Sequence, residues 1–214
     1  MNDVSRETPS APDVARRVFA DHLPLAITYA ELLATDGVTR GLIGPREAPR
    51  LWERHLLNCA VVTDLVSDGA TVADIGSGAG LPGICMAIRR PDLEITLIEP
   101  LLRRTKFLDE VVAELGLVNV SVHRARAEDL HDEHFFDVVT SRAVAPLGRL
   151  AEWSWPLCRP VGQVIAMKGA SAREEIARDA RQLAHLGVGA EIELVGAELL
   201  GEAVTVVRLK GREC

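Results

Sequence analysis

A glycine-rich turn between an apolar strand and a helix start is the feature that most constrains this chain. It lies in residues 71–83, which read T-V-A-D-I-G-S-G-A-G-L-P-G. Alternating glycines let a backbone turn sharply and approach a ligand closely. Pro82 suits the first turn of the following helix, where its missing N–H costs nothing. Because a helix start also offers free N–H groups, this stretch predicts a site for an anion or a nucleotide.

Around this turn, strand-like and helix-like periods alternate, which is the pattern of a parallel sheet in an α/β fold. Strands are expected at 72–75, 94–98, 120–123, 137–141 and 163–167. Helices are expected between and after them, at 82–90, 103–115, 146–157 and 172–186. Two further strand-like runs, 191–199 and 203–210, are joined by a Leu-Gly-Glu turn and predict a terminal hairpin.

The first third of the chain is helical and precedes every predicted strand. Residues 1–12 hold two prolines among polar residues and are expected to form a disordered tail. Residues 13–68 are expected to form an N-terminal helical extension, in which Pro24 divides one helix from the next. Residues 69–214 then form the α/β domain.

Bulk composition narrows the class of protein. A chain of 214 residues suffices for one substantial domain with an extension, and 48% hydrophobic with 26% charged residues is typical of a globular protein. No apolar run is long enough to predict a membrane helix, and the N-terminus lacks a secretory pattern, so we expect a cytoplasmic protein. The six histidines and four cysteines show no metal-ligand spacing. No additional apolar strip is evident, so we expect a monomer.

The net charge of −7 by itself argues against a nucleic-acid partner. The basic residues nevertheless cluster, and the two clusters are Arg40, Arg46, Arg50 and Arg54, and Arg103, Arg104 and Lys106. Aromatic residues make up only 4% of the chain, which does not favour a base-stacking surface. If RNA binds, arginine contacts to phosphate are expected to supply the affinity, which then falls steeply with salt.

Two nucleotide cofactors compete for the glycine-rich turn. Residues 78–83 fit G-x-G-x-x-G, the dinucleotide fingerprint, whereas the frame Asp74-x-Gly76-x-Gly78-x-Gly80 fits the S-adenosylmethionine loop of methyltransferases. An acidic side chain at Asp74 adds like charge beside a pyrophosphate, but it suits the cationic, amine-bearing methionine part of S-adenosylmethionine. We therefore favour S-adenosylmethionine.

Polar residues also follow the next two predicted strands. Glu99 ends the second strand, where a carboxylate can accept hydrogen bonds from two ribose hydroxyls. Ala127 and Glu128 follow the third strand, in a loop that lies beside the adenine in this kind of fold. There a backbone N–H and a carboxylate can contact the edge of the base. For Glu128, a solvent-exposed acidic loop is the alternative.

Taken together, these segments resemble the RsmG (GidB) family, bacterial methyltransferases of small-subunit ribosomal RNA. The matching segments are W-E-R-H-L-L-N (52–58), D-I-G-S-G-A-G-L-P-G (74–83), residues 99–108, R-A-E (126–128), F-D-V-V-T-S-R-A (136–143) and M-K-G (167–169). The resemblance implies a class I methyltransferase fold, a Rossmann-like, mostly parallel seven-stranded sheet with an antiparallel C-terminal hairpin strand. It implies S-adenosylmethionine as donor and, as acceptor, N7 of one guanine in the decoding-region loop of 16S ribosomal RNA. The cofactor contacts it implies are Gly76, Leu81, Ala127, Glu128 and Arg142.

Four other residues are candidates for contact with RNA or with the target base: Arg54, His55, Asn58 and Lys168. Arg54 and His55 lie on the helix before the first strand and are expected to reach over the site as a lid. The family commonly has Asp where this chain has Asn58, which keeps an acceptor oxygen but loses the charge, so a role that needs a carboxylate there is in doubt. Lys168 ends the fifth strand, where it can meet phosphate. The alternatives are a surface salt bridge for Arg54, a helix-packing or capping role for His55 and a solvent-exposed strand end for Lys168.

Methylation of guanine N7 needs no general base, because N7 attacks through an in-plane lone pair and no proton has to leave first. We therefore expect no acid or base catalyst and no metal, and positioning is expected to supply much of the acceleration. Arg142 should contact the cofactor, O6 or phosphate, since a donor on N7 blocks the attack. The alternatives are a small-molecule methyltransferase of the same fold, which the acidic net charge favours, and a non-catalytic cofactor- or RNA-binding ribosome assembly factor.

Overall fold

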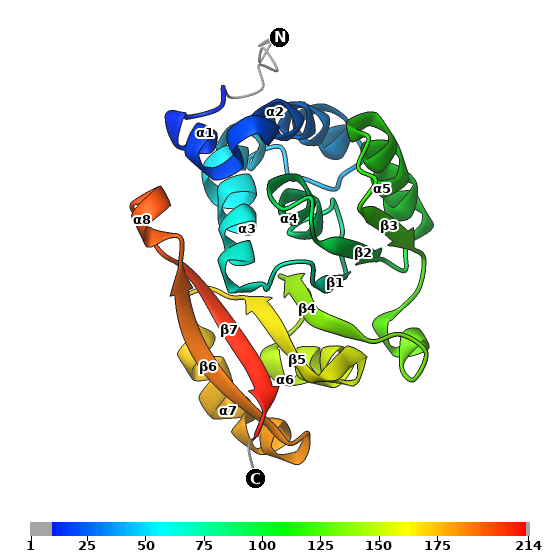
Figure 1. The fold of residues 1–214 in the computed structure, drawn as a ribbon, viewed down its shortest axis with the longest axis vertical. Coiled ribbons are helices and arrows are strands. Elements are labelled where there is room, and N and C mark those ends of the chain that lie inside the picture. Colours follow the sequence, from blue (N-terminus) through cyan, green and yellow to red (C-terminus); the bar gives the residue numbers. More distant parts are fainter. Residues whose placement is uncertain (1–9, 213–214) are drawn as a thin grey trace.

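Seven strands form one twisted sheet in the computed structural model, which describes residues 10–212 (Figure 1). The strands are β1 (Thr71–Ile75), β2 (Glu94–Ile98), β3 (Val120–His123), β4 (Phe136–Arg142), β5 (Cys158–Met167), β6 (Val188–Val195) and β7 (Val204–Gly211). Their spatial order is β3-β2-β1-β4-β5-β7-β6. Strands β1 to β5 are parallel, and β7 runs antiparallel to β5 and to β6. The expected α/β sheet with an antiparallel terminal strand is confirmed.

The path of the chain across the sheet reverses beside β1. Strands β2 and β3 follow outward on one side of β1, and the chain then returns to place β4 on the other side. In an open α/β sheet, ligands bind in the crevice at such a reversal, outside the carboxyl ends of the strands. The glycine-rich turn after β1 and the end of β4 therefore meet where a ligand site is expected.

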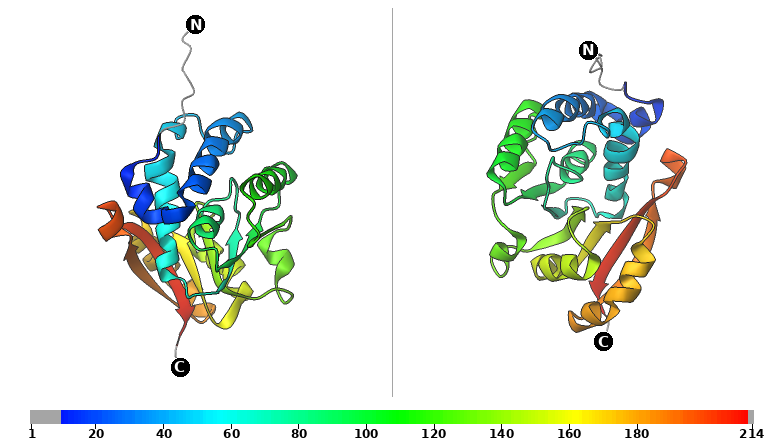
Figure 2. Two further views of the ribbon diagram at one scale, coloured as in Figure 1. Left: turned by 45° about the horizontal axis from the view of Figure 1, so that its top comes forward. Right: turned by 180° about the vertical axis from the view of Figure 1, so that it is seen from behind.

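Helices lie on both sides of the sheet (Figure 2). One side carries α1 (Asp13–Phe19), α2 (Leu23–Leu32), α3 (Leu57–Val61), α4 (Gly83–Arg89) and α5 (Leu102–Leu115), and the other carries α6 (Leu147–Ser154) and α7 (Ala172–His185). Phe19 and Leu56 of the N-terminal helices share one apolar core with Ile84 and Leu108 of α4 and α5. The expected extension over 13–68 is thus packed into the same core as the sheet.

The N-terminal helices are irregular in several places, among them a π-helical segment, η2 (Leu33–Gly37), directly after α2. Pro24 falls in the first turn of α2, and the prediction that it separates two helices is confirmed. Before α3 the chain forms a 3-10 turn, η3 (Ala48–Arg50), and then a wider π-helical segment, η4 (Leu51–Leu56). Segments of π-helix occur frequently at functional sites, and η4 carries both Arg54 and His55.

The predicted continuous strand over 191–199 is wrong. Strand β6 ends at Val195, and a single helical turn, α8 (Ala197–Leu200), follows before β7. Gly196 explains the break, because its φ of 77° is left-handed and a Cβ there would lie 2.7 Å from a methyl carbon of Val61. The expected tail over 1–12 falls mostly outside the described residues. Within residues 10–212, no helix is long and apolar enough to cross a membrane.

Candidate functional site

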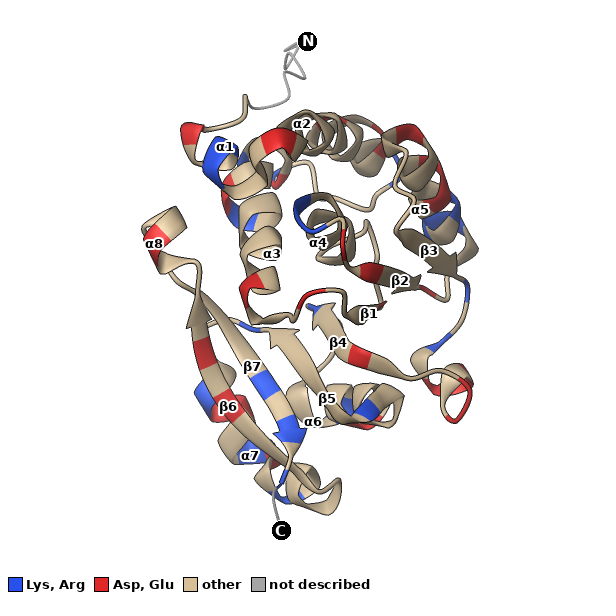
Figure 3. Cartoon of the chain, viewed as in Figure 1, with Lys and Arg blue, Asp and Glu red and all other residues tan. Residues whose placement is uncertain are grey.

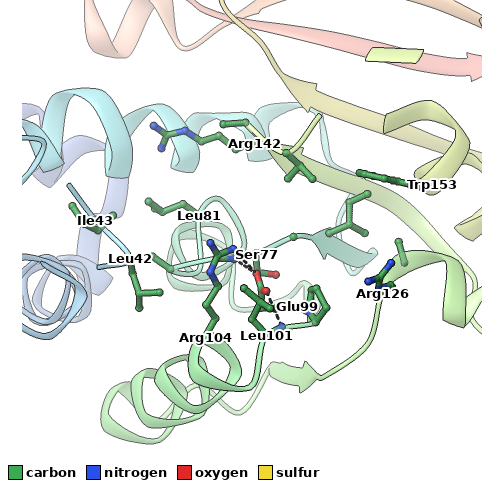
Figure 4. A pocket seen from close by; sticks show the side chains of 18 of the residues that line it. Leu42, Ile43, Ser77, Leu81, Glu99, Leu101, Arg104, Arg126, Arg142 and Trp153 are labelled. Carbon is green, nitrogen blue, oxygen red and sulfur yellow. Dashed lines mark hydrogen bonds and ion pairs between the residues drawn. The ribbon is translucent and has the colours of Figure 1, made fainter. Parts of the chain in front are cut away.

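A cavity of about 690 Å³ opens at the carboxyl edge of the sheet (Figure 4). The loops that follow β1 to β4 all contribute to its wall. They supply residues 76–79 and Leu81, residues 99–101, residues 126–128 and residues 142–144. The N-terminal segment adds Leu42, Ile43 and His55. This volume lies within the usual range for a small-molecule site.

Most of the residues expected to contact a cofactor line this cavity. They are Gly76, Gly78, Leu81, Glu99, Ala127, Glu128 and Arg142. Asp74 and Gly80 are buried and are not among the lining residues. Of the four candidates for RNA contact, His55 lines the cavity, whereas Arg54, Asn58 and Lys168 lie outside its wall.

Two glycines of the turn have positions that no other residue can occupy without displacement. The φ angles of Gly76 and Gly80 are 66° and 97°. A Cβ on Gly76 would lie 2.8 Å from a methyl carbon of Val144, and one on Gly80 would lie 2.5 Å from Ile84. The turn is therefore shaped by its neighbours in the loop after β4 and on α4 as well as by its own sequence.

Asp74 supports the turn from within the protein. Its Oδ2 accepts a hydrogen bond from the Gly83 N–H at 3.0 Å, at the start of α4, and the Ser77 hydroxyl donates to its carbonyl oxygen at 2.7 Å. The other carboxylate oxygen, Oδ1, is buried without a hydrogen-bond partner. Burial raises the pKa of Asp74 to about 8. A positive charge placed near the unpartnered Oδ1 would favour the ionised carboxylate and lower this pKa again.

Asp74→Asn is expected to stabilise the protein relative to wild type, increasingly so as pH rises from about 4 to about 8. The folded wild type keeps the Asp74 proton up to a pH of about 8, whereas the ordinary carboxyl value is 3.8. The native state thus binds more protons than the unfolded state in this window, and its stability falls as pH rises. Asparagine removes this dependence and keeps an acceptor for Gly83. Urea denaturation across the window measures the effect, and a pH-independent difference in unfolding free energy contradicts it.

Glu99 joins the turn to the start of α5. Its side chain is 1% exposed. Its Oε2 accepts from the Gly78 N–H at 3.0 Å, and its Oε1 accepts from the Leu101 N–H at 3.0 Å. Arg104 Nη1 lies 3.3 Å from Oε2, as the dashed lines of Figure 4 show. Because a carboxylate offers about four lone-pair sites, Glu99 keeps acceptor capacity for hydroxyl groups of a ligand.

Arg142, at the end of β4, is held by side chains of the N-terminal segment. Its Nη2 lies 2.7 Å from His55 Nδ1, and its Nη1 lies 3.4 Å from Cys59 Sγ. On the far side of the ring, His55 Nε2 lies 2.9 Å from Glu47 Oε2, and Arg54 Nη1 lies 3.4 Å from Glu47 Oε1. The sequence patterns missed Glu47, because it lies in a loop where no periodic pattern points to His55.

Lys168 has partners of its own outside the cavity. Its side chain is 11% exposed, and Nζ donates to the Ala145 carbonyl at 2.8 Å and to Glu175 Oε2 at 2.9 Å. Glu175 also accepts from the Leu147 N–H at 3.0 Å. Lys168 thereby braces the loop between β4 and α6, whose first residues line the cavity, and its contact with phosphate stays a prediction.

Tyr29 links the N-terminal helices to the glycine-rich turn. Its hydroxyl donates to the Ala79 carbonyl at 2.8 Å, and its side chain is fully buried. Burial raises the pKa of Tyr29 well above its ordinary value, so the phenol stays a donor. The helical spacing of the sequence predicts only a core position for Tyr29, since its partner lies 50 residues away.

Tyr29→Phe is expected to lower the unfolding free energy by about 1–2 kcal/mol, because it leaves the buried Ala79 carbonyl without its donor. We also expect S-adenosylmethionine to bind roughly three- to ten-fold more weakly, since the turn loses the hydrogen bond that holds its Ala79 carbonyl in place. Denaturation and titration calorimetry measure the two effects. The matched control is Thr28→Ala, whose hydroxyl bonds within its own helix, to the Pro24 carbonyl. Unchanged cofactor affinity in Tyr29→Phe would contradict this coupling.

Comparison with known proteins identifies relatives over most of the chain. A family model described as rRNA small subunit methyltransferase G matches residues 22–196. A protein named ribosomal RNA small subunit methyltransferase G from Nocardioides sp. is 63% identical over 207 residues, which cover 96% of this chain and 82% of the relative. One of the same name from Corynebacterium efficiens is 56% identical over 206 residues, which cover 94% and 88%.

Solved structures share the fold at low sequence identity. A precorrin-6y C5,15-methyltransferase from Geobacter metallireducens superposes with a TM-score of 0.53 at 15% identity, over 80% of this chain and 91% of that chain. A SAM-dependent O-methyltransferase from Thermotoga maritima superposes with a TM-score of 0.54 at 12% identity, over 73% and 66%. The methyltransferase fold expected from the sequence is confirmed.

Proposed function

We propose that this chain, which belongs to the rRNA small subunit methyltransferase G family, uses S-adenosylmethionine to methylate N7 of one guanine in 16S ribosomal RNA. The observation that carries the proposal is the cavity in which the glycine-rich turn, Glu99 and residues 126–128 meet His55 and Arg142. The first three belong to motifs that the family uses for its cofactor, and the last two to motifs that set the family apart. The choice of N7 and of the decoding-region loop follows from the family resemblance.

The residues of the cavity suit S-adenosylmethionine. The backbone of Gly76 and Leu81 would hold its methionine part, Glu99 its ribose, and Ala127 with Glu128 its adenine. Oδ1 of Asp74 is buried without a hydrogen-bond partner, and the positive charge of a bound ligand would favour the ionised form of this carboxyl group. The left-handed φ angles of Gly76 and Gly80 keep the turn packed against Val144 and Ile84, which a Cβ at either position would displace.

This reaction requires the protein to orient the two substrates, and it requires no proton transfer. S-adenosylmethionine supplies an electrophilic methyl group carried on a sulfonium. Guanine N7 brings its own lone pair and loses no proton, so His55, Glu99 and Glu128 of the cavity wall are needed for binding and positioning only. Holding the base edge in line and excluding water supplies the acceleration. Arg142 would bind the cofactor, O6 or phosphate, because a donor on N7 blocks attack.

Exposed arginines, one of which (Arg126) lines the cavity, offer this acidic protein positive charge for RNA. Many basic residues are already neutralised, as in the pairs Arg40–Glu110, Arg54–Glu47, Arg89–Asp64 and Arg90–Asp92. Within residues 10–212, the ion pairs include none of five exposed arginines: Arg46, Arg50, Arg103, Arg124 and Arg126. Figure 3 shows basic residues on α5, whose first turns carry Arg103, Arg104 and Lys106, and Arg104 lines the cavity. We propose that these arginines contact phosphate.

Methyl transfer to ribosomal RNA from cells that lack the gene tests the function. The purified protein and labelled donor are expected to add one methyl group, which mass spectrometry maps to one guanine N7, with activity falling steeply as salt rises. Naked 16S RNA and assembled small subunits are both offered, and transfer to neither overturns the proposal. Transfer to a metabolite without RNA points to the small-molecule alternative, and cofactor binding without turnover to an assembly factor. We expect the enzyme to act in the cytoplasm as a monomer of 23.2 kDa.

A further inference from the structure

Arg142 is a cavity-lining cation whose ordered partner is an imidazole rather than a carboxylate. The Nη2 to Nδ1 distance to His55 is 2.7 Å, and the ion pairs among residues 10–212 do not include Arg142. A guanidinium has only donors, so Nδ1 of His55 must accept. Nδ1 therefore carries no proton while this contact exists.

The proton of neutral His55 then resides on Nε2, where Glu47 receives it. The Nε2 to Oε2 distance is 2.9 Å, and the His55 side chain is 10% exposed. A hydrogen bond at one ring nitrogen determines which tautomer the histidine adopts. Glu47 thus selects the tautomer in which the opposite nitrogen can accept from Arg142. The donor chain runs from Arg142 through His55 to Glu47 and ties the end of β4 to the segment before η3.

A neutral partner orients Arg142 without cancelling its charge. A carboxylate at the same place would pair bidentately with the guanidinium and neutralise it. The imidazole takes up one donor, and Cys59 Sγ takes up another at 3.4 Å. The remaining donors and the full positive charge stay available to a ligand in the cavity.

We propose that Glu47 and His55 are positioning residues that hold the Arg142 guanidinium in the orientation needed to bind the cofactor or the target base, and that a second proton on His55 releases it. The expected effect on activity rests on the proposed function, the transfer of a methyl group to ribosomal RNA. In the doubly protonated ring, an N–H at Nδ1 faces an N–H of Arg142, so attraction turns into repulsion. Methyl transfer then falls on the acidic side as His55 becomes charged.

The charges around His55 set the pH of this release. Burial and then the Arg142 charge lower the pKa of His55 from its ordinary value of 6.5, and Arg54 also lowers it. Glu47 opposes them through its hydrogen bond and its charge. The other titratable groups that interact with the charge of Arg142 are Tyr29 of α2, Cys59 of α3 and Cys85 of α4. The net direction leaves His55 neutral at neutral pH.

Two amide substitutions separate the two contacts of His55. Asparagine places its amide oxygen where Nδ1 lies and so keeps an acceptor for Arg142. Glutamine places its amide group where Nε2 lies, so it keeps the hydrogen bond to Glu47 and loses the one from Arg142. We expect His55→Asn to retain about ten-fold more methyl transfer than His55→Gln, and we expect the acidic limb of its pH–rate profile to disappear. Equal losses in the two variants with an unaltered limb overturn the proposal.

The hydrogen bonds that run from Arg142 through His55 to Glu47 are called the relay below. Glu47→Gln tests it through the pH dependence of methyl transfer, with His55 left in place. The amide oxygen can still accept from Nε2, but the carboxylate that stabilises the imidazolium is gone. The acidic limb is therefore expected to move to lower pH, a shift that a merely structural role of Glu47 does not produce. A limb that stays in place or moves upward contradicts the relay. His185→Asn, at the exposed end of α7, is the matched control and should follow wild type.

Nitrogen-15 NMR of histidine-labelled protein tests the relay independently of catalysis. The His55 signals are assigned by their loss in His55→Asn. We expect the Nε2–H tautomer at neutral pH, a titration midpoint below 6.5, and a still lower midpoint in Glu47→Gln. An Nδ1–H tautomer or an unmoved midpoint overturns the relay, whatever the substrate proves to be. A protein with the expected tautomer that methylates no ribosomal RNA instead overturns the proposed function.

Discussion

Glu99→Ala is expected to lower the affinity for S-adenosylmethionine by about 100-fold or more. Each hydrogen bond to a charged group contributes roughly 1.5–3 kcal/mol, so losing two ribose contacts alone amounts to about 3–6 kcal/mol, and each tenfold corresponds to about 1.4 kcal/mol. The variant also removes the acceptor for the Gly78 and Leu101 N–H groups and leaves Arg104 without its carboxylate. The turn and the start of α5 are then no longer joined.

Titration calorimetry measures this loss, and a thermal denaturation curve shows whether the variant is folded. Glu99→Gln is expected to fall between the variant and wild type, because the amide keeps one acceptor oxygen but brings a donor toward the Gly78 N–H. Glu94→Ala, at the exposed start of β2, the strand that Glu99 follows, is the matched control. If Glu99→Ala bound the cofactor within about three-fold of wild type, Glu99 would have no part in holding the ribose.

Gly80→Ala is expected to abolish cofactor binding and to lower the unfolding free energy by about 2–5 kcal/mol. The added Cβ would lie 2.5 Å from Ile84 Cγ1 and 2.9 Å from the Tyr29 hydroxyl, at a φ of 97°. Three elements meet at this point, since Leu108 of α5 lies 3.2 Å away. Relief of the clash must move the turn or the Tyr29 ring, and either movement breaks the contact with Ala79.

Gly116→Ala separates the effect of the backbone angle from the effect of the clash. Gly116 ends α5 with a φ of 60°, and a Cβ added there would point into open space, with no neighbouring heavy atom within 4 Å. Alanine there is expected to cost about 1 kcal/mol and to leave cofactor binding unchanged. Urea denaturation and calorimetry compare the two variants, and equal stability losses would show that the packing around Gly80 has no special importance.

Net charge was the least informative property of the sequence about the partner. The value of −7 summarises the whole chain, but phosphate contacts depend on which cations stand free at one surface. Arg89 and Arg90 are anchored by Asp64, Asp68 and Asp92, so this pair is a structural clamp. The sequence could not separate such clamps from free arginines, because an ion pair between distant segments leaves no local pattern.

The sequence by itself determined the five parallel strands, the helices between them and the place of the cofactor turn. Strand and helix periods are local properties, and parallel strands bring their carboxyl ends to one edge. For that reason Gly76, Glu99, Ala127 and Arg142 could be assigned to one cavity from their positions at strand ends alone.

Only the tertiary structure decided which side chains bond to one another there. His55 meets Arg142 across 87 residues, and Tyr29 meets Ala79 across 50. The Asp74 side chain accepts a hydrogen bond from the Gly83 N–H inside the protein, and Lys168 forms an ion pair with Glu175. These pairings depend on how α2, η4 and β4 pack in space and on which buried polar groups need a partner, and no spacing along the chain encodes them.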